Sequence, residues 1–375
     1  GVEIEKHGTR DAAGRLAIEN FDQTEVFRGR FVDPRTHHLM RARTTQFLET
    51  RERLFRTRVA AGRVRDCHGD LHSPNVCILA DGKPVVYDCI EFSPAYRCGD
   101  VASEVAFTAM DLEFRGRADL ADAFVETYGR IAGDPTLEAA LPFYKAYRAM
   151  VRAKISSLTA SATEVDEAVR ARAADDARKL YALAERYTRG LVPPTVIVLS
   201  GLTGVGKTAV ADKLRRAAGL APLETDRIRK ELAGLDPSKP APAGVGQGIY
   251  THAMTAATYR TLARGAAERI EQGDAPLAVG TFVAREQRKA LRDVAAEAKT
   301  PLLFVRLTAP QDVVEGRLTK RPPGMSDGTV EVYRSMLQRA EAPDEIPESE
   351  RLDVDTSNRD PETSAEVILA RLRGE

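Results

Sequence analysis

The residues best suited to chemistry lie at positions 201–208, which read Gly-Leu-Thr-Gly-Val-Gly-Lys-Thr. An apolar, strand-like segment, TVIVLS, precedes them, and the helical pattern KTAVADKLRRAA overlaps their end. Glycines let successive N–H groups converge on an anion, and a helix N-terminus adds partial positive charge. We therefore expect a phosphate loop in which Lys207 reaches the terminal phosphates and Thr208 binds Mg²⁺. The predicted cradle comprises Gly201, Gly204, Val205, Gly206, Lys207 and Thr208.

A carboxylate and a guanidinium follow the next strand-like segment. The segment PLET leads into Asp226, and Arg229 comes three residues later. Ligands of open α/β folds bind at the carboxyl ends of the strands. At such a position Asp226 could accept the proton of an attacking hydroxyl, and Arg229 could hold the acceptor or a phosphate. Asp226 could also be a helix N-cap, with or without a role in the site.

Basic residues lead into a loop rich in Pro and Gly further along the chain. Arg317 and Arg321 precede PPGMSDG, and the helical pattern VEVYRSMLQ follows. This arrangement is typical of a mobile lid, which would bring positive charge onto a transferring phosphoryl group. The alternative interpretation is a solvated helix end.

The segments GLTGVGKT, TDRIRKEL and RLTKR…SDGTVEVY together resemble the small P-loop kinases, a group that includes gluconate kinase and the kinase half of polynucleotide kinase. The resemblance implies ATP- and Mg²⁺-dependent phosphoryl transfer to a hydroxyl. It makes Asp226 the base, and Arg229, Arg317 and Arg321 electrostatic stabilisers. One position departs from the pattern, because Val279 stands where relatives often carry an acidic residue. This departure predicts weak turnover, or a metal held through Thr208 and water alone.

A second group with catalytic potential lies at residues 68–75, His-Gly-Asp-Leu-His-Ser-Pro-Asn, and the next strand carries Asp88. The spacing H-x-D-x-x-x-x-N followed by Asp is typical of a protein-kinase-like catalytic loop. Asp70 would orient or deprotonate an acceptor hydroxyl. Asn75 and Asp88 would coordinate Mg²⁺ on the nucleotide phosphates.

This region resembles the aminoglycoside phosphotransferase and choline kinase group. The stretches CHGDLHSPNV, YDCIEF, GDVASEVAF and FYKAYRAMVR are closer still to bacterial two-part proteins that fuse such a phosphotransferase-like domain to a P-loop kinase domain. That resemblance covers nearly all of the chain. It implies that Asp100 braces the catalytic loop, with Glu104 one turn beyond it.

Kinases of this kind bind ATP with a glycine-rich loop and a strand lysine. Residues 1–66 contain neither, and Lys6 is their only lysine. We therefore expect residues 1–190 to form a phosphotransferase-like C-lobe without its N-lobe. The working nucleotide site is then expected in the P-loop kinase domain, residues 191–375.

Helical patterns dominate the first of these domains. Apolar residues recur at helical spacing over 37–60 and again from 100 to about 187, and NVCIL and PVVYDCI flank a hairpin turn at 80–83. Segment 163–187 is expected to be an exposed linking helix, and Pro193-Pro194 marks the domain boundary. In the second domain, short strand segments alternate with helices. This alternation predicts an α/β fold whose parallel sheet is covered by helices on both faces.

Charge and cysteine content limit the partners. Because 55 Lys and Arg balance 55 Asp and Glu, the zero net charge argues against nucleic acid or an acidic membrane as partner. No apolar run approaches the roughly 18 residues that span a bilayer, so we expect a soluble, cytoplasmic protein. The spacing of the cysteines is not that of a zinc site, which favours buried, reduced thiols. These cysteines are Cys67, Cys77, Cys89 and Cys98.

The patterns together predict a kinase that transfers the γ-phosphate of ATP to a hydroxyl of a small molecule. The alternative is a nucleotide-sensing regulator, or an ATPase without an acceptor, which Val279 and the incomplete first domain favour. A polynucleotide 5′-kinase is a third interpretation, and the balanced charge weakens it. The identity of the acceptor is not encoded in these motifs.

Overall fold

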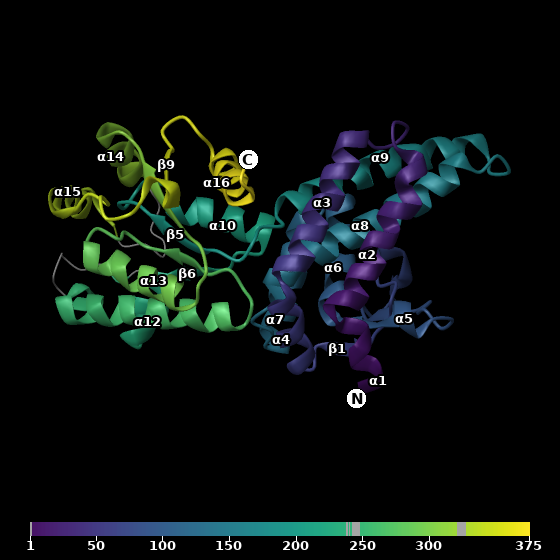
Figure 1. Cartoon of the computed structure of the whole chain (residues 1–375), viewed down its shortest axis with the longest axis horizontal. Helices are drawn as coiled ribbons and strands as arrows, with labels where there is room; N and C mark the ends of the chain where they lie inside the picture. The colour runs from purple at the N-terminus through teal and green to yellow at the C-terminus, as the bar shows by residue number, and fades with distance from the viewer. Residues whose placement is uncertain (1, 238, 240, 242–247, 321–327) are drawn as a thin grey trace. The chain divides into compact units, whose positions relative to one another are not determined.

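The computed structural model describes residues 2–237, 239, 241, 248–320 and 328–375 (Figure 1). The chain divides into two compact units. The first comprises Gly1–Val192 with Ala217–Gly219, and the second comprises Pro193–Arg216 with Leu220–Glu375. Each unit has its own core, so we treat them separately.

The first unit is mainly helical, which confirms the fold class expected from the apolar periodicity. Two small antiparallel sheets accompany the helices, β1 with β4 and β2 with β3. The strands are β1 (Val64–Asp66), β2 (Val76–Ile78), β3 (Pro84–Val86) and β4 (Cys98–Asp100). The helices are α1 (Val2–Glu5), α2 (Arg10–Thr24), α3 (Pro34–Thr50), α4 (Glu52–Ala60), α5 (Pro94–Arg97), α6 (Val101–Phe114), α7 (Ala118–Ala132), α8 (Leu137–Ser161) and α9 (Glu167–Arg189).

The helical pattern over residues 37–60 belongs to two helices, α3 and α4, which meet at Arg51. The Arg51 side chain is buried, and its Nη2 donates to the Val192 carbonyl oxygen at 2.9 Å. A buried guanidinium needs such acceptors, since an unpaired one would be costly. The break between α3 and α4 therefore coincides with a contact between Arg51 and a residue 141 positions away. Such a contact cannot be predicted from the spacing of apolar residues.

Segment 163–187 is not an exposed linking helix, contrary to the sequence-based expectation. Its helix α9 buries one face, which includes Ala177, Tyr181 and Ala184, in the core of the first unit. α8 lies beside it (Figure 1), and the Tyr181 hydroxyl is 3.3 Å from Ser157 Oγ of α8. Small alanines at helical spacing allow this close approach. The expectation was wrong because the segment is rich in Ala, Asp, Glu and Arg, and its apolar face consists largely of alanine, which also occurs on exposed helices.

His37 of α3 is a buried titratable group whose ring nitrogen Nε2 lies 2.9 Å from Thr24 Oγ1. Burial lowers the pKa of His37, and the positive charges of Arg28 and Arg41 lower it further, while Glu25 opposes them. The unfolded chain, with a histidine pKa of about 6.5, therefore binds a proton that the folded unit resists. We expect the free energy of unfolding of the first unit to fall as the pH drops through and below that value.

Urea titrations at about pH 7.5 and about pH 5.5 would check this pH dependence. The variant His37→Gln, which keeps a polar partner for Thr24, should lose stability less steeply with acid than the wild type. His38→Gln, at an exposed position of the same helix, is the matched control and should behave like the wild type. An unchanged pH dependence in His37→Gln would contradict the assignment.

The cysteines are only partly buried, so the expectation of four buried thiols is wrong. Cys98 is buried and Cys67 half-buried, whereas Cys77 and Cys89 are exposed, and all four are free thiols. The physical reason lies in the β2–β3 hairpin, because Val85 and Val86 of β3 are exposed and the neighbouring thiols therefore lie on an uncovered surface. Burial raises the pKa of Cys67 to about 12, and the charges of Glu104 and Asp100 add to the effect.

The second unit contains a five-stranded parallel sheet in the order β6-β7-β5-β8-β9, which confirms the α/β prediction. The central strand β5 is buried along its whole length. The chain leaves β5 toward the β6 side and leaves β8 toward β9, so the strand order reverses between β5 and β8. Ligands of open α/β sheets bind at such a reversal, at the carboxyl ends of the strands. The strands are β5 (Val196–Ser200), β6 (Pro222–Glu224), β7 (Leu277–Val279), β8 (Leu302–Thr308) and β9 (Arg351–Asp355).

Helices cover both faces of this sheet. In Figure 1, α12 and α13 lie on one side of it, and α10 and α16 lie on the other. Val198 and Phe304 of the sheet share a buried cluster with Leu262 of α12 and Leu291 of α13. The helices are α10 (Lys207–Ala218), α11 (Thr225–Leu232), α12 (His252–Glu271), α13 (Arg285–Glu297), α14 (Gln311–Lys320), α15 (Val330–Arg339) and α16 (Pro361–Arg373).

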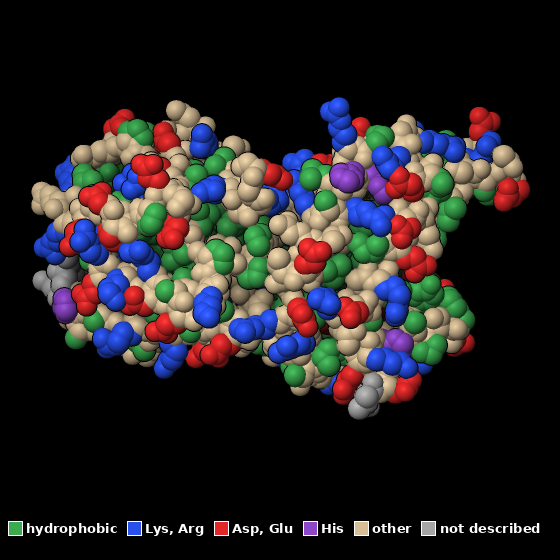
Figure 2. All heavy atoms as spheres, viewed as in Figure 1, with side chains coloured by type: hydrophobic (Ala, Val, Ile, Leu, Met, Phe, Trp, Pro, Cys, Tyr) green, Lys and Arg blue, Asp and Glu red, His purple; other side chains and the backbone are tan. Residues whose placement is uncertain are grey.

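The surface carries both signs of charge. Figure 2 shows Lys and Arg side chains interspersed with Asp and Glu over the described parts of both units on the face in view. This distribution agrees with the zero net charge. None of the helices within the described ranges is long and apolar enough to cross a bilayer.

Candidate active site

The loop after β5 has a backbone that requires glycine. Gly201, Gly204 and Gly206 have φ angles of 148°, 85° and 97°, which side-chain-bearing residues rarely adopt. A Cβ at Gly201 would lie 2.7 Å from the Leu307 carbonyl oxygen, and one at Gly204 would lie 2.8 Å from a methyl group of Val314. Alternating backbone conformations of this kind form anion-binding nests. The loop and α10, which starts at Lys207, therefore have the geometry of a phosphate cradle.

A cavity of about 820 Å³ opens at this loop and brings most of the predicted residues together. Gly201 and Val205 are not among its lining residues; Gly201 packs against β8, and Val205 is buried. Arg321 lies outside the described residues. The predicted residues that line the cavity are Gly204, Gly206, Lys207, Thr208, Asp226, Arg229 and Arg317.

Lys207 folds back over the loop, and its Nζ donates to the Leu202 carbonyl oxygen at 2.9 Å. This contact keeps the ammonium group close to the cradle, where phosphate oxygens would bind. The Thr208 hydroxyl and the carboxylates of Glu224 and Asp226 line the same cavity. Mg²⁺ prefers hard oxygen ligands and keeps several waters, so this donor set fits the ion.

Asp226 lies in the first turn of α11, which starts at Thr225, so it does not cap that helix. Its Oδ1 accepts from Nη1 of Arg229 at 3.1 Å. The Arg229 guanidinium is buried and lies over the Tyr250 ring, with its carbon 4.8 Å from the ring centroid. Its Nε has no hydrogen-bond partner within the described part of the chain. The pair therefore places a carboxylate and a guanidinium among the lining residues of the same cavity.

Glu224 is a cavity residue that the sequence analysis did not assign. It ends β6 and pairs in register with Val279 of β7, and both residues line the cavity. Burial raises the pKa of the Glu224 carboxyl, and the charge of Asp226 raises it further, whereas Arg227 and Lys207 lower it. The sequence did contain a pattern that could have predicted this role, because Glu224 and Asp226 are two acids separated by a single residue at the end of a strand.

Arg317 of α14 makes contacts that the lid interpretation did not anticipate. Its Nη1 donates to Thr356 Oγ1 at 3.1 Å, and its Nη2 donates to the Thr356 carbonyl oxygen at 2.6 Å. Thr356 directly follows β9, so the contact holds the guanidinium at the β8–β9 side of the phosphate loop. Asp226 and Glu224 lie at the opposite, β6 side of the sheet.

In the first unit, Asp70 and Asn75 are brought together. The Asn75 amide donates to Asp70 Oδ2 at 3.1 Å and to the Asp70 carbonyl oxygen at 2.9 Å. His72 Nε2 lies 3.3 Å from Asp70 Oδ2, and the buried His72 ring stacks on Phe107. The hydrogen bonds to His72 and Asn75 lower the pKa of Asp70 despite its partial burial. Asp70 is therefore held as a carboxylate.

Asp88 lies on an exposed segment next to this loop and has a φ angle of 63°. Residues before and after Asp88 are hydrogen-bonded to His68. The ring Nε2 of His68 lies 2.8 Å from the Tyr87 carbonyl oxygen, and the His68 carbonyl oxygen accepts from the Ile90 N–H at 2.9 Å. Positive φ in an Asp is a strained conformation that often marks a functional residue. Within the described ranges, no three His, Cys, Asp or Glu side chains are arranged to hold a metal ion.

The carboxylate that braces the 68–75 loop is Glu104, not Asp100. Glu104 accepts from the His68 and Gly69 N–H groups at 3.1–3.2 Å. Asp100 instead accepts two hydrogen bonds from Arg58 and caps α6 through the Ala102 N–H. Asp100 pairs with Val64 where β4 meets β1, and there its carboxylate contacts Arg58 of α4 rather than the loop.

Helix α6 presents further hydrogen-bonding side chains to the loop at helical spacing. Thr108 Oγ1 donates to the Leu71 carbonyl oxygen at 2.9 Å, and Asp111 accepts from the Ser73 N–H at 3.0 Å. On the other side, Arg148 of α8 donates to the Gly69 carbonyl oxygen at 2.9 Å and to Glu104 at 3.3 Å. Positions 104, 108 and 111 share one face of a helix. One face of α6, with Arg148, therefore sets the loop conformation.

Comparisons with known proteins match both halves of the chain. Residues 7–143 match the model of the phosphotransferase enzyme family, and residues 196–343 match the model of the AAA domain. The second match contains the phosphate loop and the Asp226–Arg229 pair.

The chain joins a phosphotransferase-family domain to a P-loop kinase domain. This assignment confirms the two-part organisation that the sequence resemblance implied.

Similarity over most of the chain extends to uncharacterized proteins of Mycobacterium bovis and Mycobacterium tuberculosis. Each is 30% identical over 336 residues, which cover 90% of this chain and 66% of the relative. The chain thus spans slightly less than two thirds of the length of these relatives.

Solved structures resemble only part of the chain. A sugar kinase from Janibacter is 24% identical with a TM-score of 0.37, and covers 48% of this chain and 95% of that one. A gluconokinase from Sinorhizobium meliloti is 22% identical with a TM-score of 0.36, and covers 48% of this chain and 93% of that one.

Proposed function

We propose that the P-loop kinase domain transfers the γ-phosphate of ATP to a hydroxyl group of a small molecule. The observation that carries this proposal is the single cavity that both the phosphate loop and the Asp226–Arg229 pair line. Phosphoryl transfer needs the donor phosphate, a proton acceptor and cationic groups in one water-limited space. The cavity offers a cradle for the donor phosphate, a carboxylate as proton acceptor and the cationic side chains of Lys207, Arg229 and Arg317.

Each residue has a definite task in this proposal. The loop N–H groups and Lys207 bind the phosphates, and Asp226 accepts the hydroxyl proton of the acceptor. Arg229, which lines the cavity, binds an oxygen of the acceptor or of the phosphoryl group. Thr208 and Glu224 would hold Mg²⁺ directly or through water, and the ion would neutralise charge on the phosphates.

Labelled ATP incubated with a panel of sugars, sugar acids, aminoglycosides and short oligonucleotides tests the proposal. Transfer of label to a hydroxylated small molecule is the expected result. ATP hydrolysis that no acceptor increases would overturn it and favour the second candidate, a nucleotide-sensing regulator or ATPase. Val279 favours that candidate, because an apolar residue at the end of β7 lines the cavity beside the proposed metal ligands.

The substitution Asp226→Asn should lower acceptor phosphorylation by about a hundredfold or more while ATP affinity changes little. The amide keeps the size of the side chain but cannot take a proton. Steady-state kinetics and ATP titration would measure the two effects separately. Asp293→Asn, an exposed acid of α13 in the same domain, is the control. Full activity in Asp226→Asn would exclude this residue as the base.

A further inference from the structure

Thr356 is a buried threonine at the end of β9 that contacts the underside of the phosphate loop. Its Oγ1 donates to the Val205 carbonyl oxygen at 2.9 Å and also lies 3.1 Å from the Thr308 carbonyl oxygen. Its backbone N–H continues the sheet ladder by donating to Thr308 at 2.8 Å. The side chain is 4% exposed, so water does not compete for these bonds.

The bond to Val205 has a consequence for the next amide in the loop. A trans peptide unit is planar, and its C=O and N–H groups point in opposite directions. Holding the Val205 carbonyl against Thr356 therefore turns the Gly206 N–H away from β9. Gly206 lines the cavity, whereas Val205 is buried beneath it, so the N–H is directed toward the phosphate position.

The peptide needs such an anchor because glycine leaves it free to rotate. Gly206 has a φ angle of 97°, and a Cβ placed there would meet no atom within 4 Å. Steric contacts at Gly206 therefore do not select one orientation of the Val205–Gly206 peptide. A hydrogen bond from a rigid strand end can select it.

We propose that Thr356 is a positioning residue for phosphate binding, whose hydroxyl orients the Gly206 N–H toward the bound phosphates. This inference rests on the proposed nucleotide site and adds a residue that acts on it from behind the loop. Thr356 also receives both hydrogen bonds from Arg317. One residue thus sets the direction of a binding amide and the place of a cation.

Two substitutions separate the hydroxyl from the shape of the side chain. Thr356→Val keeps the branched shape but removes the donor to Val205, and Thr356→Ser keeps the donor but removes the methyl group. Thr258→Val is the matched control, since Thr258 is also buried in this unit and donates to a carbonyl oxygen, that of Met254, at 2.8 Å. Thr258 is not a lining residue of the cavity.

Binding of ATP and of inorganic pyrophosphate, measured by calorimetry on the whole chain, gives the first readout. We expect Thr356→Val to weaken both affinities by about tenfold, the usual effect of losing one hydrogen bond that orders a binding group. Thr356→Ser should stay within about twofold of the wild type, as should Thr258→Val.

The second readout follows the Gly206 amide directly and does not depend on ligand. Labelling with ¹³C′-valine and ¹⁵N-glycine selects only Val–Gly amides, of which the chain has three, at residues 205–206, 245–246 and 279–280. The Gly206 resonance should shift in Thr356→Val and return to its wild-type position in Thr356→Ser. A merely structural role for Thr356 would lower stability without moving this resonance selectively.

Three results would contradict the inference. Wild-type affinity and an unmoved Gly206 resonance in Thr356→Val would overturn it. A loss in Thr356→Ser with none in Thr356→Val would assign the effect to the shape of the side chain and also overturn it. If the wild type bound neither ATP nor pyrophosphate, the proposed function itself would be wrong and the inference would fall with it.

Discussion

Replacing Lys207 by alanine is expected to lower ATP turnover by about a thousandfold or more, because the cavity loses the ammonium group that follows the phosphate loop. The Nζ of Lys207 bonds to the Leu202 carbonyl oxygen, so its charge stays at the cradle. Nearby, Glu224 and Asp226 contribute negative charge to the same cavity. Without Lys207 these carboxylates would repel the phosphates of the nucleotide.

The matched control is Lys213→Ala, on the same helix α10 but paired with Glu362 at 2.8 Å on the surface. Its turnover should equal that of the wild type. Circular dichroism should show that both variants are folded, because Lys207 is partly exposed and lies in a loop-proximal turn. Wild-type turnover in Lys207→Ala would show that the P-loop domain is not the working nucleotide site.

The same variant does not separate a kinase from a nucleotide sensor, since both need the loop. Asp226→Asn does separate a kinase from a sensor, because a sensor transfers no phosphoryl group and so needs no base. The two substitutions therefore test different halves of the cavity: the cradle at β5 and the acid at β6.

The features of this fold that could be predicted from the sequence are those that depend on residues close together in the chain. Strand β5 is an unbroken apolar run, and the glycines that follow it have positive φ angles that only glycine adopts readily. Asp226 and Arg229 could be placed at the sheet edge because they directly follow a strand-like segment. In the structure these residues and the phosphate loop line one cavity.

The parts that could not be predicted depend on partners far away in sequence. Thr356 lies 151 residues from Val205, and no spacing rule links them. Glu104 and Asp100 are both acids at the start of α6, and only their distant partners, the 68–75 loop and Arg58, show which one braces the loop. The burial of one face of α9 could likewise not be predicted, because alanine occurs both on protein surfaces and in cores.

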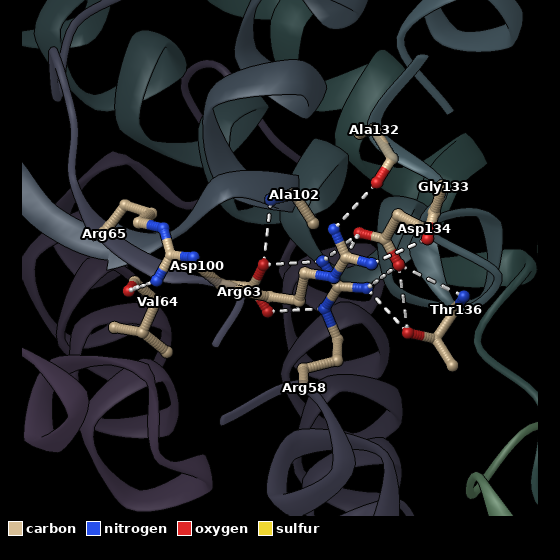
Figure 3. A network of polar contacts seen from close by, with 10 residues as sticks. All are labelled: Arg58, Arg63, Val64, Arg65, Asp100, Ala102, Ala132, Gly133, Asp134 and Thr136. Carbon is tan, nitrogen blue, oxygen red and sulfur yellow. Dashed lines mark hydrogen bonds and ion pairs between the residues drawn. The ribbon is translucent and has the colours of Figure 1, made fainter. Parts of the chain in front are cut away.

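Arg58→Met is expected to destabilise the phosphotransferase-family domain by about 3–5 kcal/mol, because it leaves the buried Asp100 carboxylate without its cation and Asp134 with only Arg63, whose Nε lies 3.8 Å away. Arg58 of α4 is 1% exposed and lies between Asp100 and Asp134, whose side chains are fully buried (Figure 3). All five guanidinium hydrogens are used, in two bonds to Asp100, two to Asp134 and one to Thr136. Burial opposes the charge, yet the bonds to Asp100 and Asp134 raise the pKa of Arg58 above its usual range.

Hydrogen exchange measured peptide by peptide suits this prediction, because the second domain serves as an internal reference. Exchange should accelerate across α4, α6 and the α7–α8 turn in Arg58→Met, and should stay unchanged in residues 248–320. Arg56→Met, an exposed position of the same helix, is the control and should leave both domains unaffected. Unchanged protection in Arg58→Met would show that the network contributes little to stability.

The Arg58 network is also connected to the residues that hold the 68–75 loop, and this connection allows a further test. Asp100 both binds Arg58 and caps α6, and α6 carries the residues that hold the 68–75 loop. The triple variant Arg58→Met, Asp100→Asn, Asp134→Asn removes the cation and both charges together. It should recover part of the lost stability, since neutral amides are less costly to bury than unpaired carboxylates. If the triple variant were less stable than Arg58→Met, the loss would come from packing around the arginine rather than from unpaired charge.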